Sequence, residues 1–239
     1  MQHFNKLLFT ALLGALLTGC GGGSTVADAD NDQVITVGDS IFDLSNEIQI
    51  NLESFAGQTF RKYTKSGAEL SGGSVAQSVV DQYAEAKADN SAITTVVMDG
   101  GGNDILIPVI SLADPYGCKT NIFRSDISSN CKALIDDVYV EAVNLLNSMD
   151  NDGVQNVVYL GYYHTKNAFY NNLGALAKAV DYGDLRLAQA CNNSTVNCTF
   201  LDPRSLIVNS DINADGIHPN SSGSLKLANL IWPTLQPLL

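Results

Sequence analysis

Short apolar runs alternate along this chain with longer segments in which apolar residues recur every three or four positions. The runs end in turn residues or in a change of pattern, as at Gly38 after the run 34–37. Continuous apolar runs of this length are typical of strands that are buried on both faces, as in a parallel sheet covered by helices. The segments expected to form strands are 34–37, 60–64, 93–98, 157–160 and 198–201, with 60–64 nearer an edge of the sheet.

The amphipathic segments between these runs predict helices that cover the sheet. The apolar residues that share a helical face are Val75, Val79 and Tyr83, then Leu134, Val138, Leu145 and Met149, and then Leu173, Leu176 and Val180. A last helix is expected over about 222–232, ending at Pro233. Strands that alternate with helices predict a three-layer α/β domain with one five-stranded, mainly parallel sheet. In such a sheet, ligands bind at the carboxyl ends of the strands.

The composition fits one such domain and excludes one class of partner. With 239 residues, of which 45% are hydrophobic, the chain can bury a core of ordinary size. Its formal net charge is -12 at pH 7, and no large cluster of Lys and Arg offsets it. Proteins bind nucleic acids by neutralising phosphates with such residues, so no nucleic-acid partner is expected.

Residues 1–19 are expected to be a signal peptide for export. Lys6 precedes an apolar run over 7–17, which is too short for a membrane-spanning helix of about 20 residues. The run leads into Leu17-Thr18-Gly19-Cys20, which resembles the lipobox of bacterial lipoproteins. The resemblance implies that Cys20 is lipidated and attaches the protein to a membrane, while an ordinary secretory signal is the alternative. The expected location is the bacterial cell envelope, on the periplasmic or outer-membrane face, or the medium outside the cell.

Residues 20–32 are small, polar and acidic, and they are expected to form a flexible tether before a folded domain over residues 33–239. Export brings the thiols into an oxidising compartment. The cysteines after Cys20 allow three pairings, and the two local pairs are expected because they close short loops. These pairs are Cys118 with Cys131 and Cys191 with Cys198. Their spacing does not match the ligand spacing of a zinc site, so no metal is expected.

A serine, a histidine and an aspartate with catalytic chemistry lie in predicted loops. Ser40 follows the first strand, where a helix is expected to begin near Ile41, so its N–H lies at the positive end of that helix. His218 lies just before the last helix, and Asp215 three residues earlier can accept its Nδ1–H and aim Nε2 outward. The three side chains therefore predict a nucleophile, a base and an acid that orients the base.

Two glycine-rich loops could supply further hydrogen-bond donors to the same point. Asn103 lies in the loop after the third strand, where glycines allow the backbone to approach a ligand. Gly72 lies between the second strand and the helix expected near Val75, and its N–H could point the same way. Gly73 is adjacent, and the sequence does not choose between the two glycines.

These segments resemble the sequence blocks of the SGNH (GDSL-type) serine hydrolases, in the family's order. The matching segments are Gly38-Asp39-Ser40-Ile41, the glycine at 72, Gly101-Gly102-Asn103-Asp104 and Asp215-Gly216-Ile217-His218. The resemblance implies a flavodoxin-like α/β/α domain with Ser40 as nucleophile, His218 as base and Asp215 as orienting acid. It also implies an oxyanion hole made of the N–H groups of Ser40 and Gly72 and the amide of Asn103. Ile41 replaces the family's Leu with a residue of equal size.

Several of these residues also have simpler interpretations. Ser40 could be only a helix cap. Residues 211–216 match the first half of a calcium-binding loop, but Ser222 stands where that loop needs Glu. His164 is expected to be structural rather than part of the site. The long segment 105–130 is either a packed loop excursion or a wall for the acyl group of a substrate.

The resulting hypothesis is a serine ester hydrolase that acts through an acyl-enzyme on short- to medium-chain acyl esters and needs no cofactor. Its substrate is a small-molecule or lipid acyl ester, and its membrane contact is the lipid anchor. Two alternatives on the same fold are an envelope acyltransferase and a non-catalytic glycan-binding lipoprotein. The sequence leaves the chain length of the acyl group and the oligomeric state open.

Overall fold

A computed structural model describes residues 24–73, 75–168 and 171–239. Within them, five parallel strands form one sheet in the order β2-β1-β3-β4-β5. The strands are β1 (Asn31–Val37), β2 (Phe60–Lys62), β3 (Thr95–Met98), β4 (Asn156–Leu160) and β5 (Asn197–Leu201). Each expected strand is therefore confirmed, with small changes at its ends.

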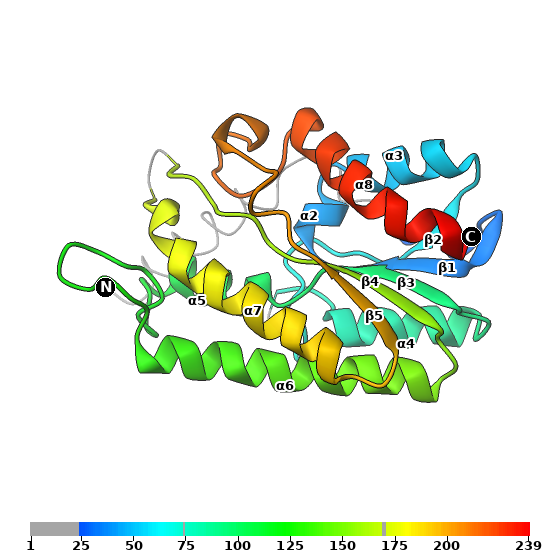
Figure 1. Cartoon of the computed structure of the whole chain (residues 1–239), viewed down its shortest axis with the longest axis horizontal. Helices are drawn as coiled ribbons and strands as arrows, with labels where there is room; N and C mark the ends of the chain where they lie inside the picture. Colours follow the sequence, from blue (N-terminus) through cyan, green and yellow to red (C-terminus); the bar gives the residue numbers. More distant parts are fainter. Residues whose placement is uncertain (1–23, 74, 169–170) are drawn as a thin grey trace, which may run out of the picture.

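Helices cover both faces of the sheet, so the predicted three-layer architecture is confirmed (Figure 1). The α-helices are α2 (Ser40–Asp43), α3 (Glu47–Ala56), α4 (Val79–Asp89), α5 (Gly102–Ser111), α6 (Ser129–Asn151), α7 (Ala177–Asn193) and α8 (Ser221–Leu235). Short 3-10 helices are η1 (Leu173–Leu176), η2 (Asn209–Asp211) and η3 (Gln236–Leu238). Helices α4, α6 and α7 lie on one side of the sheet, and α3 and α8 lie on the other.

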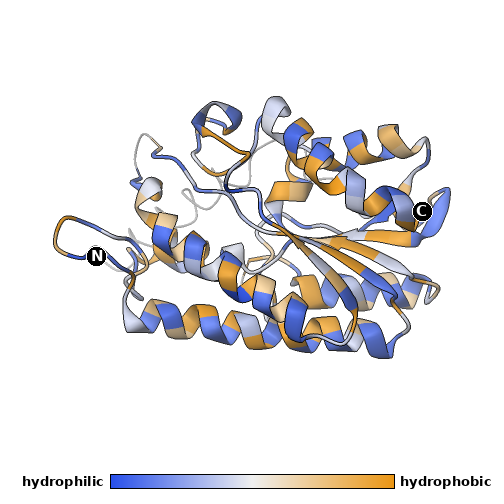
Figure 2. Cartoon of the chain, in the orientation of Figure 1, coloured by the Kyte–Doolittle hydropathy of each residue, from blue (hydrophilic) through white to orange (hydrophobic). Residues whose placement is uncertain are grey.

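Alternate residues of each central strand enter separate cores on the two faces. In β4, Val157 and Tyr159 pack with α4, α6 and α7, whereas Val158 and Leu160 pack with α3 and α8. Figure 2 shows the covering helices striped with hydrophobic and hydrophilic residues, as expected for helices with one buried face. A third cluster joins α5, α6 and α7 to Ile217, next to a predicted site residue.

Three segments differ from the predicted elements. Val75 lies outside the helix that it was expected to share with Val79 and Tyr83, because α4 begins at Val79 after the N-cap Ser78. The last helix does not end at Pro233 but continues to Leu235, because Leu235 is fully buried against α3 and the sheet and holds the final turn in place. The segment 105–130 is not one loop excursion, since helix α5 occupies its first part and contains Pro108. Packing of the apolar residues of α5 outweighs the cost of a proline inside a helix.

The N-terminal part of the folded domain begins before residue 33. Val26 and Lys62 exchange backbone hydrogen bonds of 2.9 and 2.8 Å, and Asp30 bonds to Thr59. Strand β2 is at the edge of the sheet, so its free backbone groups accept this extra segment. Residues 24–32 of the predicted tether therefore lie against the domain. The predicted signal peptide and Cys20 lie outside the described residues.

Both local disulfides form as predicted. Cys118–Cys131 joins the loop after α5 to the start of α6, and Cys191–Cys198 joins the end of α7 to β5. The first pair is fully buried in the third cluster. Among the described residues, none of the helices has the length and apolar character needed to span a membrane.

Candidate active site

The end of β1 presents Ser40 at the carboxyl edge of the sheet. Gly38 is required there, because a Cβ at this position would collide with the Asp99 carboxyl group that follows β3. The Asp39 N–H donates to Asp99 Oδ1 at 2.7 Å, and Asp39 Oδ1 accepts the N–H of Ile41 at 2.9 Å. Asp39 is thus the N-cap of the single-turn helix α2, and Ser40 is its first residue. No hydrogen bond of the Ser40 N–H is present among the described residues.

The structure brings the three predicted site residues into one chain of hydrogen bonds. His218 Nε2 lies 2.8 Å from Ser40 Oγ, and His218 Nδ1 lies 2.8 Å from Asp215 Oδ2. Asp215 Oδ1 also accepts the backbone N–H groups of Ile217 and His218 at 2.8 and 3.0 Å. Burial raises the pKa of Asp215, but the hydrogen bonds from His218 and the Ile217 N–H outweigh it, so the pKa lies below its ordinary value. The carboxylate therefore stays ionised beside the imidazole.

The loop that carries the histidine is held by the segment after β4. Gly216 has a φ of 83°, and a Cβ there would collide with the carbonyl of Lys166. The Lys166 N–H in turn donates to the Gly216 carbonyl at 2.9 Å, and Tyr163 Oη donates to the Ile217 carbonyl at 2.6 Å. The position of the imidazole therefore depends on a turn that only glycine can form without strain.

Asn103 lies beside Ser40, as predicted, and is 6% exposed. One N–H of its amide donates to the Ala68 carbonyl at 2.9 Å, which fixes the amide plane and leaves the second N–H available. Gly102, which precedes Asn103 and begins α5, has no room for a Cβ because Tyr162 packs against it. The backbone can thus bring the amide close to the serine.

The structure does not place Gly72 beside Ser40, because Gly72 and Gly73 are exposed and line neither cavity at the serine. Gly67 lines a cavity together with Ser40 and Asn103 instead. No hydrogen bond of its N–H is present among the described residues, and its φ is 83°. Gly67 also lies nearer the end of β2 than Gly72 does, so the rule that ligands meet the carboxyl ends of strands was the signal that could have found it.

Two buried acids lie behind Ser40. Tyr162 Oη donates to Asp39 Oδ2 at 2.8 Å, and Asp99 Oδ2 has no partner among the described residues. Burial raises the pKa of Asp39, and burial together with the neighbouring Asp39 charge raises the pKa of Asp99 well above its ordinary value. A second negative charge is therefore disfavoured at this buried pair.

Other polar candidates lie apart from Ser40. His164 Nε2 is 2.9 Å from Asp181 Oδ1, and Arg204 Nη1 is 3.0 Å from the same oxygen. His164 lines neither cavity at the serine, in agreement with its expected structural role. Asp211, from the candidate calcium loop, pairs with Lys226. Within the described ranges, no group of three or more His, Cys, Asp or Glu residues is arranged to hold a metal ion.

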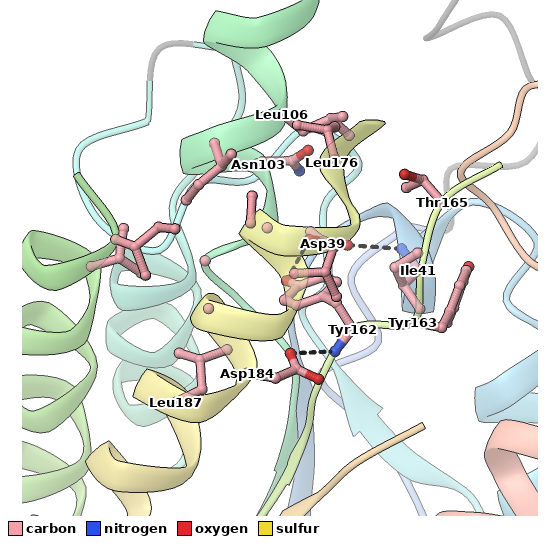
Figure 3. A pocket seen from close by; sticks show the side chains of 18 of the residues that line it. Asp39, Ile41, Asn103, Leu106, Tyr162, Tyr163, Thr165, Leu176, Asp184 and Leu187 are labelled. Carbon is pink, nitrogen blue, oxygen red and sulfur yellow. Dashed lines mark hydrogen bonds between the residues drawn. The ribbon is translucent and has the colours of Figure 1, made fainter. Parts of the chain in front are cut away.

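Two cavities meet at Ser40. The larger, of about 100 Å³, runs between α5, α6 and α7, and the smaller, of about 60 Å³, opens beside the histidine. Both are lined by Ser40, Asn103, Leu106 and Ile217. Figure 3 shows Asn103 and Leu106 toward one end of the larger cavity and Asp184 and Leu187 toward the other. Asp184 was not identified from the sequence, because tertiary packing decides which face of α7 is turned toward the cavity.

The same arrangement of helices and strands occurs in solved structures of hydrolases. A GDSL-like lipase from Bacteroides thetaiotaomicron has a TM-score of 0.61 and 12% identity, over 99% of this chain and 100% of that chain. A proposed SGNH hydrolase from Slackia heliotrinireducens has a TM-score of 0.56 and 20% identity, over 84% and 97%. An acetylxylan esterase from Geobacillus stearothermophilus has a TM-score of 0.53 and 16% identity, over 85% and 92%. No model of a protein family and no curated protein sequence matches the chain.

Proposed function

We propose that this chain, which has the fold of the SGNH hydrolases, is a serine carboxylic ester hydrolase. The observation that carries the proposal is the continuous hydrogen-bonded arrangement of Ser40, His218 and Asp215 where two cavities meet. A serine, a base and an acid that orients the base are the parts needed for nucleophilic attack on a carbonyl carbon. Structural neighbours named as a lipase and an acetylxylan esterase support ester cleavage as the class of reaction.

In the first half of the reaction, Ser40 Oγ attacks the ester carbonyl carbon while His218 Nε2 takes the hydroxyl proton. The Asp215 carboxylate holds the Nδ1–H and stabilises the imidazolium that forms. The carbonyl oxygen becomes negative, and the N–H groups of Ser40 and Gly67 and the free amide N–H of Asn103 are suited to bind it. The C–O bond to the alcohol then breaks, and His218 returns the proton to the leaving oxygen.

In the second half, water replaces the alcohol. His218 takes a proton from the water as its oxygen attacks the acyl carbon, and the bond to Ser40 Oγ breaks as the proton returns to the serine. The products are a free acid and the regenerated hydroxyl. Apart from the ester and the water, each step uses only groups of the protein that lie at the site.

The fate of the acyl group separates the proposed hydrolase from its two alternatives. An acyltransferase would share the acyl-enzyme but give the acyl group to another hydroxyl, and a glycan-binding protein would cleave nothing. The mostly aliphatic lining of the larger cavity favours an acyl group over a sugar. Free acid as the main product, with candidate sugars present in excess, would favour the hydrolase over the transferase.

Export to the cell envelope is part of the same proposal. The disulfides Cys118–Cys131 and Cys191–Cys198 support an oxidising compartment, where such pairs persist. Lipidation of Cys20 would attach the domain to the membrane. Recovery of Cys20→Ser protein in the soluble fraction, with the natural sequence in the membrane fraction, would support the anchor.

Labelling of the nucleophile tests the proposal directly. A fluorophosphonate should phosphonylate Ser40 with loss of fluoride, and peptide mass spectrometry should locate the adduct. Ser40→Ala should lose the adduct and at least 10³-fold of kcat on p-nitrophenyl butanoate, with an unchanged circular dichroism spectrum. Turnover by the Ser40→Ala protein at the natural rate would contradict the assignment.

A further inference from the structure

One lining residue indicates which of the two cavities beside Ser40 holds the alcohol of the ester and which holds the acyl group. His218 lines the smaller cavity and not the larger one. Because the imidazole must deliver its proton to the leaving oxygen, the alcohol lies on the side of His218. The inference rests on the proposed function and places the alcohol in the smaller cavity and the acyl group in the larger.

Aliphatic side chains line the larger cavity, so a substrate group that enters it from Ser40 contacts mainly hydrocarbon. Three helices and η1 contribute its aliphatic walls, which are Ile105, Leu106, Ile135, Val138, Leu176 and Leu187. An alkyl chain gains free energy by leaving water for such a surface, roughly in proportion to the apolar area that it buries. A sugar ring would lose its hydrogen bonds to water there.

Most of the polar groups that reach this cavity are engaged in hydrogen bonds or ion pairs with other residues. The engaged pairs are Tyr162 Oη with Asp39 at 2.8 Å, Thr165 Oγ1 with the Leu173 carbonyl at 2.7 Å, Asp184 Oδ1 with the Tyr162 N–H at 2.9 Å, and Arg186 Nε with Asp136 at 2.7 Å. The second oxygen of Asp184 lies 3.5 Å from Arg204 Nε and makes no hydrogen bond among the described residues. The walls therefore offer few free donors or acceptors to a hydroxylated substrate.

Small residues on helix α7 leave the larger cavity open. Ala179 and Gly183, four positions apart on one face, both line the cavity. A Cβ added at Gly183 would meet no atom within 4 Å, so packing alone does not require glycine there. Glycine inside a helix costs stability relative to alanine, and the result here is an unfilled volume beside the serine.

We propose that the larger cavity selects linear acyl groups of about four to six carbons. An engineered apolar cavity of about 150 Å³ holds the six carbons of benzene, and this one measures about 100 Å³. On that scale it holds about four carbons beyond the carbonyl, which stays at Ser40. A longer chain would reach the buried Asp184 carboxyl group, which an alkyl end cannot solvate.

The test is a series of p-nitrophenyl esters from acetate to decanoate, with the alcohol held constant. For the natural chain, kcat/KM should rise about fourfold per added methylene and then level off or fall beyond hexanoate. A second series with acetate held constant and alcohols from methyl to hexyl should give its own profile, governed by the smaller cavity. A flat acyl profile, or the highest kcat/KM on acetate, would overturn the proposal.

Filling the cavity should change only the acyl profile. Gly183→Leu should lower the ratio of kcat/KM for pentanoate over acetate at least tenfold while leaving the shape of the alcohol profile unchanged. Ala179→Leu, from the same face, should act in the same direction and provides a second variant if the first does not fold. Ala188→Leu is the control, because it adds the same bulk as Ala179→Leu to α7 but outside the cavity. Its ratio of kcat/KM for pentanoate over acetate should stay within about twofold of the natural value.

The possible failures can be told apart. Loss of the alcohol preference instead of the acyl preference in Gly183→Leu would mean that the two cavities are assigned in reverse. An unchanged pentanoate ratio in both filled variants would mean that the acyl group lies elsewhere. Absence of both ester turnover and phosphonylation in the natural chain would instead overturn the proposed function itself.

Discussion

Asp215 serves the site through one carboxylate that binds three N–H groups. It holds the His218 ring through Nδ1 and also fixes the backbone of the turn through the N–H groups of Ile217 and His218. The imidazole can accept the serine proton at Nε2 only while Nδ1 keeps its hydrogen. Under the proposed function, Asp215 thus determines both the orientation and the tautomer of the His218 base.

Asp215→Asn should lower kcat by about 10³- to 10⁴-fold, because the asparagine amide donates to Nδ1 and shifts the hydrogen to Nε2. KM should change little, since Asp215 lines neither cavity. Steady-state kinetics on p-nitrophenyl butanoate measures both values. Asp211→Asn, which alters an acid of a preceding turn that pairs with Lys226, should keep kcat within about tenfold. Equal losses in both variants would indicate a folding effect rather than a tautomer effect.

Gly67 and Gly72 offer a matched pair for the oxyanion hole, with φ angles of 83° and 86°. Alanine strains the backbone at either position, but only at Gly67 does the new Cβ press on Val75 beside the serine. Gly67→Ala should therefore lower kcat at least tenfold, by displacing an oxyanion donor. Gly72→Ala should keep kcat within about threefold. Steady-state kinetics on p-nitrophenyl butanoate measures kcat, and a thermal melt of each variant checks its stability. A larger loss of kcat in Gly72→Ala than in Gly67→Ala would support the predicted role of Gly72 instead.

At the residue scale, the sequence predicts those features of the site that depend on local spacing. The Asp215 and His218 pair shares one turn, so its geometry is encoded within four residues. Gly67 was missed because several glycines follow β2, and only the tertiary path of that loop decides which one meets Ser40. Asp184 was missed because α7 has to be packed before its inward face is defined.

The buried disulfide Cys118–Cys131 joins two elements that support the histidine loop. It ties the loop after α5 to α6 within the cluster that also contains Ile217. A cross-link between residues 13 apart lowers the entropy of the unfolded chain. This link therefore couples the stability of α6 to the packing around the site.

Cys118→Ala combined with Cys131→Ala should lower the free energy of unfolding by about 3 kcal/mol. Cys191→Ala combined with Cys198→Ala removes the disulfide between residues 7 apart, which closes a shorter loop, and should cost about 2 kcal/mol. Urea denaturation followed by circular dichroism measures both differences. Loss of less than about 0.5 kcal/mol in the first double variant would show that cluster packing, not the cross-link, holds this region together.

The elements themselves were largely predictable, because buried strands and one-sided helices leave period-specific patterns. The errors arose where tertiary packing overrides a local rule. Pro108 lies inside α5 and Pro233 inside α8, where the buried neighbours Val109 and Leu235 hold the respective turns in place. The start of β1 was misplaced because pairing with an edge strand depends on the whole sheet and leaves no apolar run.

On the scale of the whole molecule, buried acids make stability depend on pH. Burial raises the pKa of Asp184 to about 7 from an ordinary value of 3.8. The folded state therefore keeps this proton at pH values where the unfolded chain has released it. The stabilising effect is complete below about pH 4 and is lost as the pH rises through about 7.

Asp184→Asn should remove this part of the pH dependence. The free energy of unfolding of the natural protein should fall by up to about 3 kcal/mol between pH 5 and pH 8 through this group, and the variant should show a flatter profile. Urea titrations at several pH values measure the slope. Asp181→Asn alters a neighbouring acid whose pKa lies below its ordinary value, so it should not flatten the profile. An unchanged slope in Asp184→Asn would show that another buried acid, such as Asp99, dominates.

The hydrogen bond between Ser40 and His218 joins residues 178 positions apart in the chain. The ribosome adds residue 40 long before residue 218, so during synthesis the chain carries the proposed nucleophile without its proposed base. Under the proposed function, a precursor held unfolded for secretion would leave the esters of its own cytoplasm intact. Turnover would begin only after the final loop docks, so a fluorogenic ester would time the completion of folding rather than its onset.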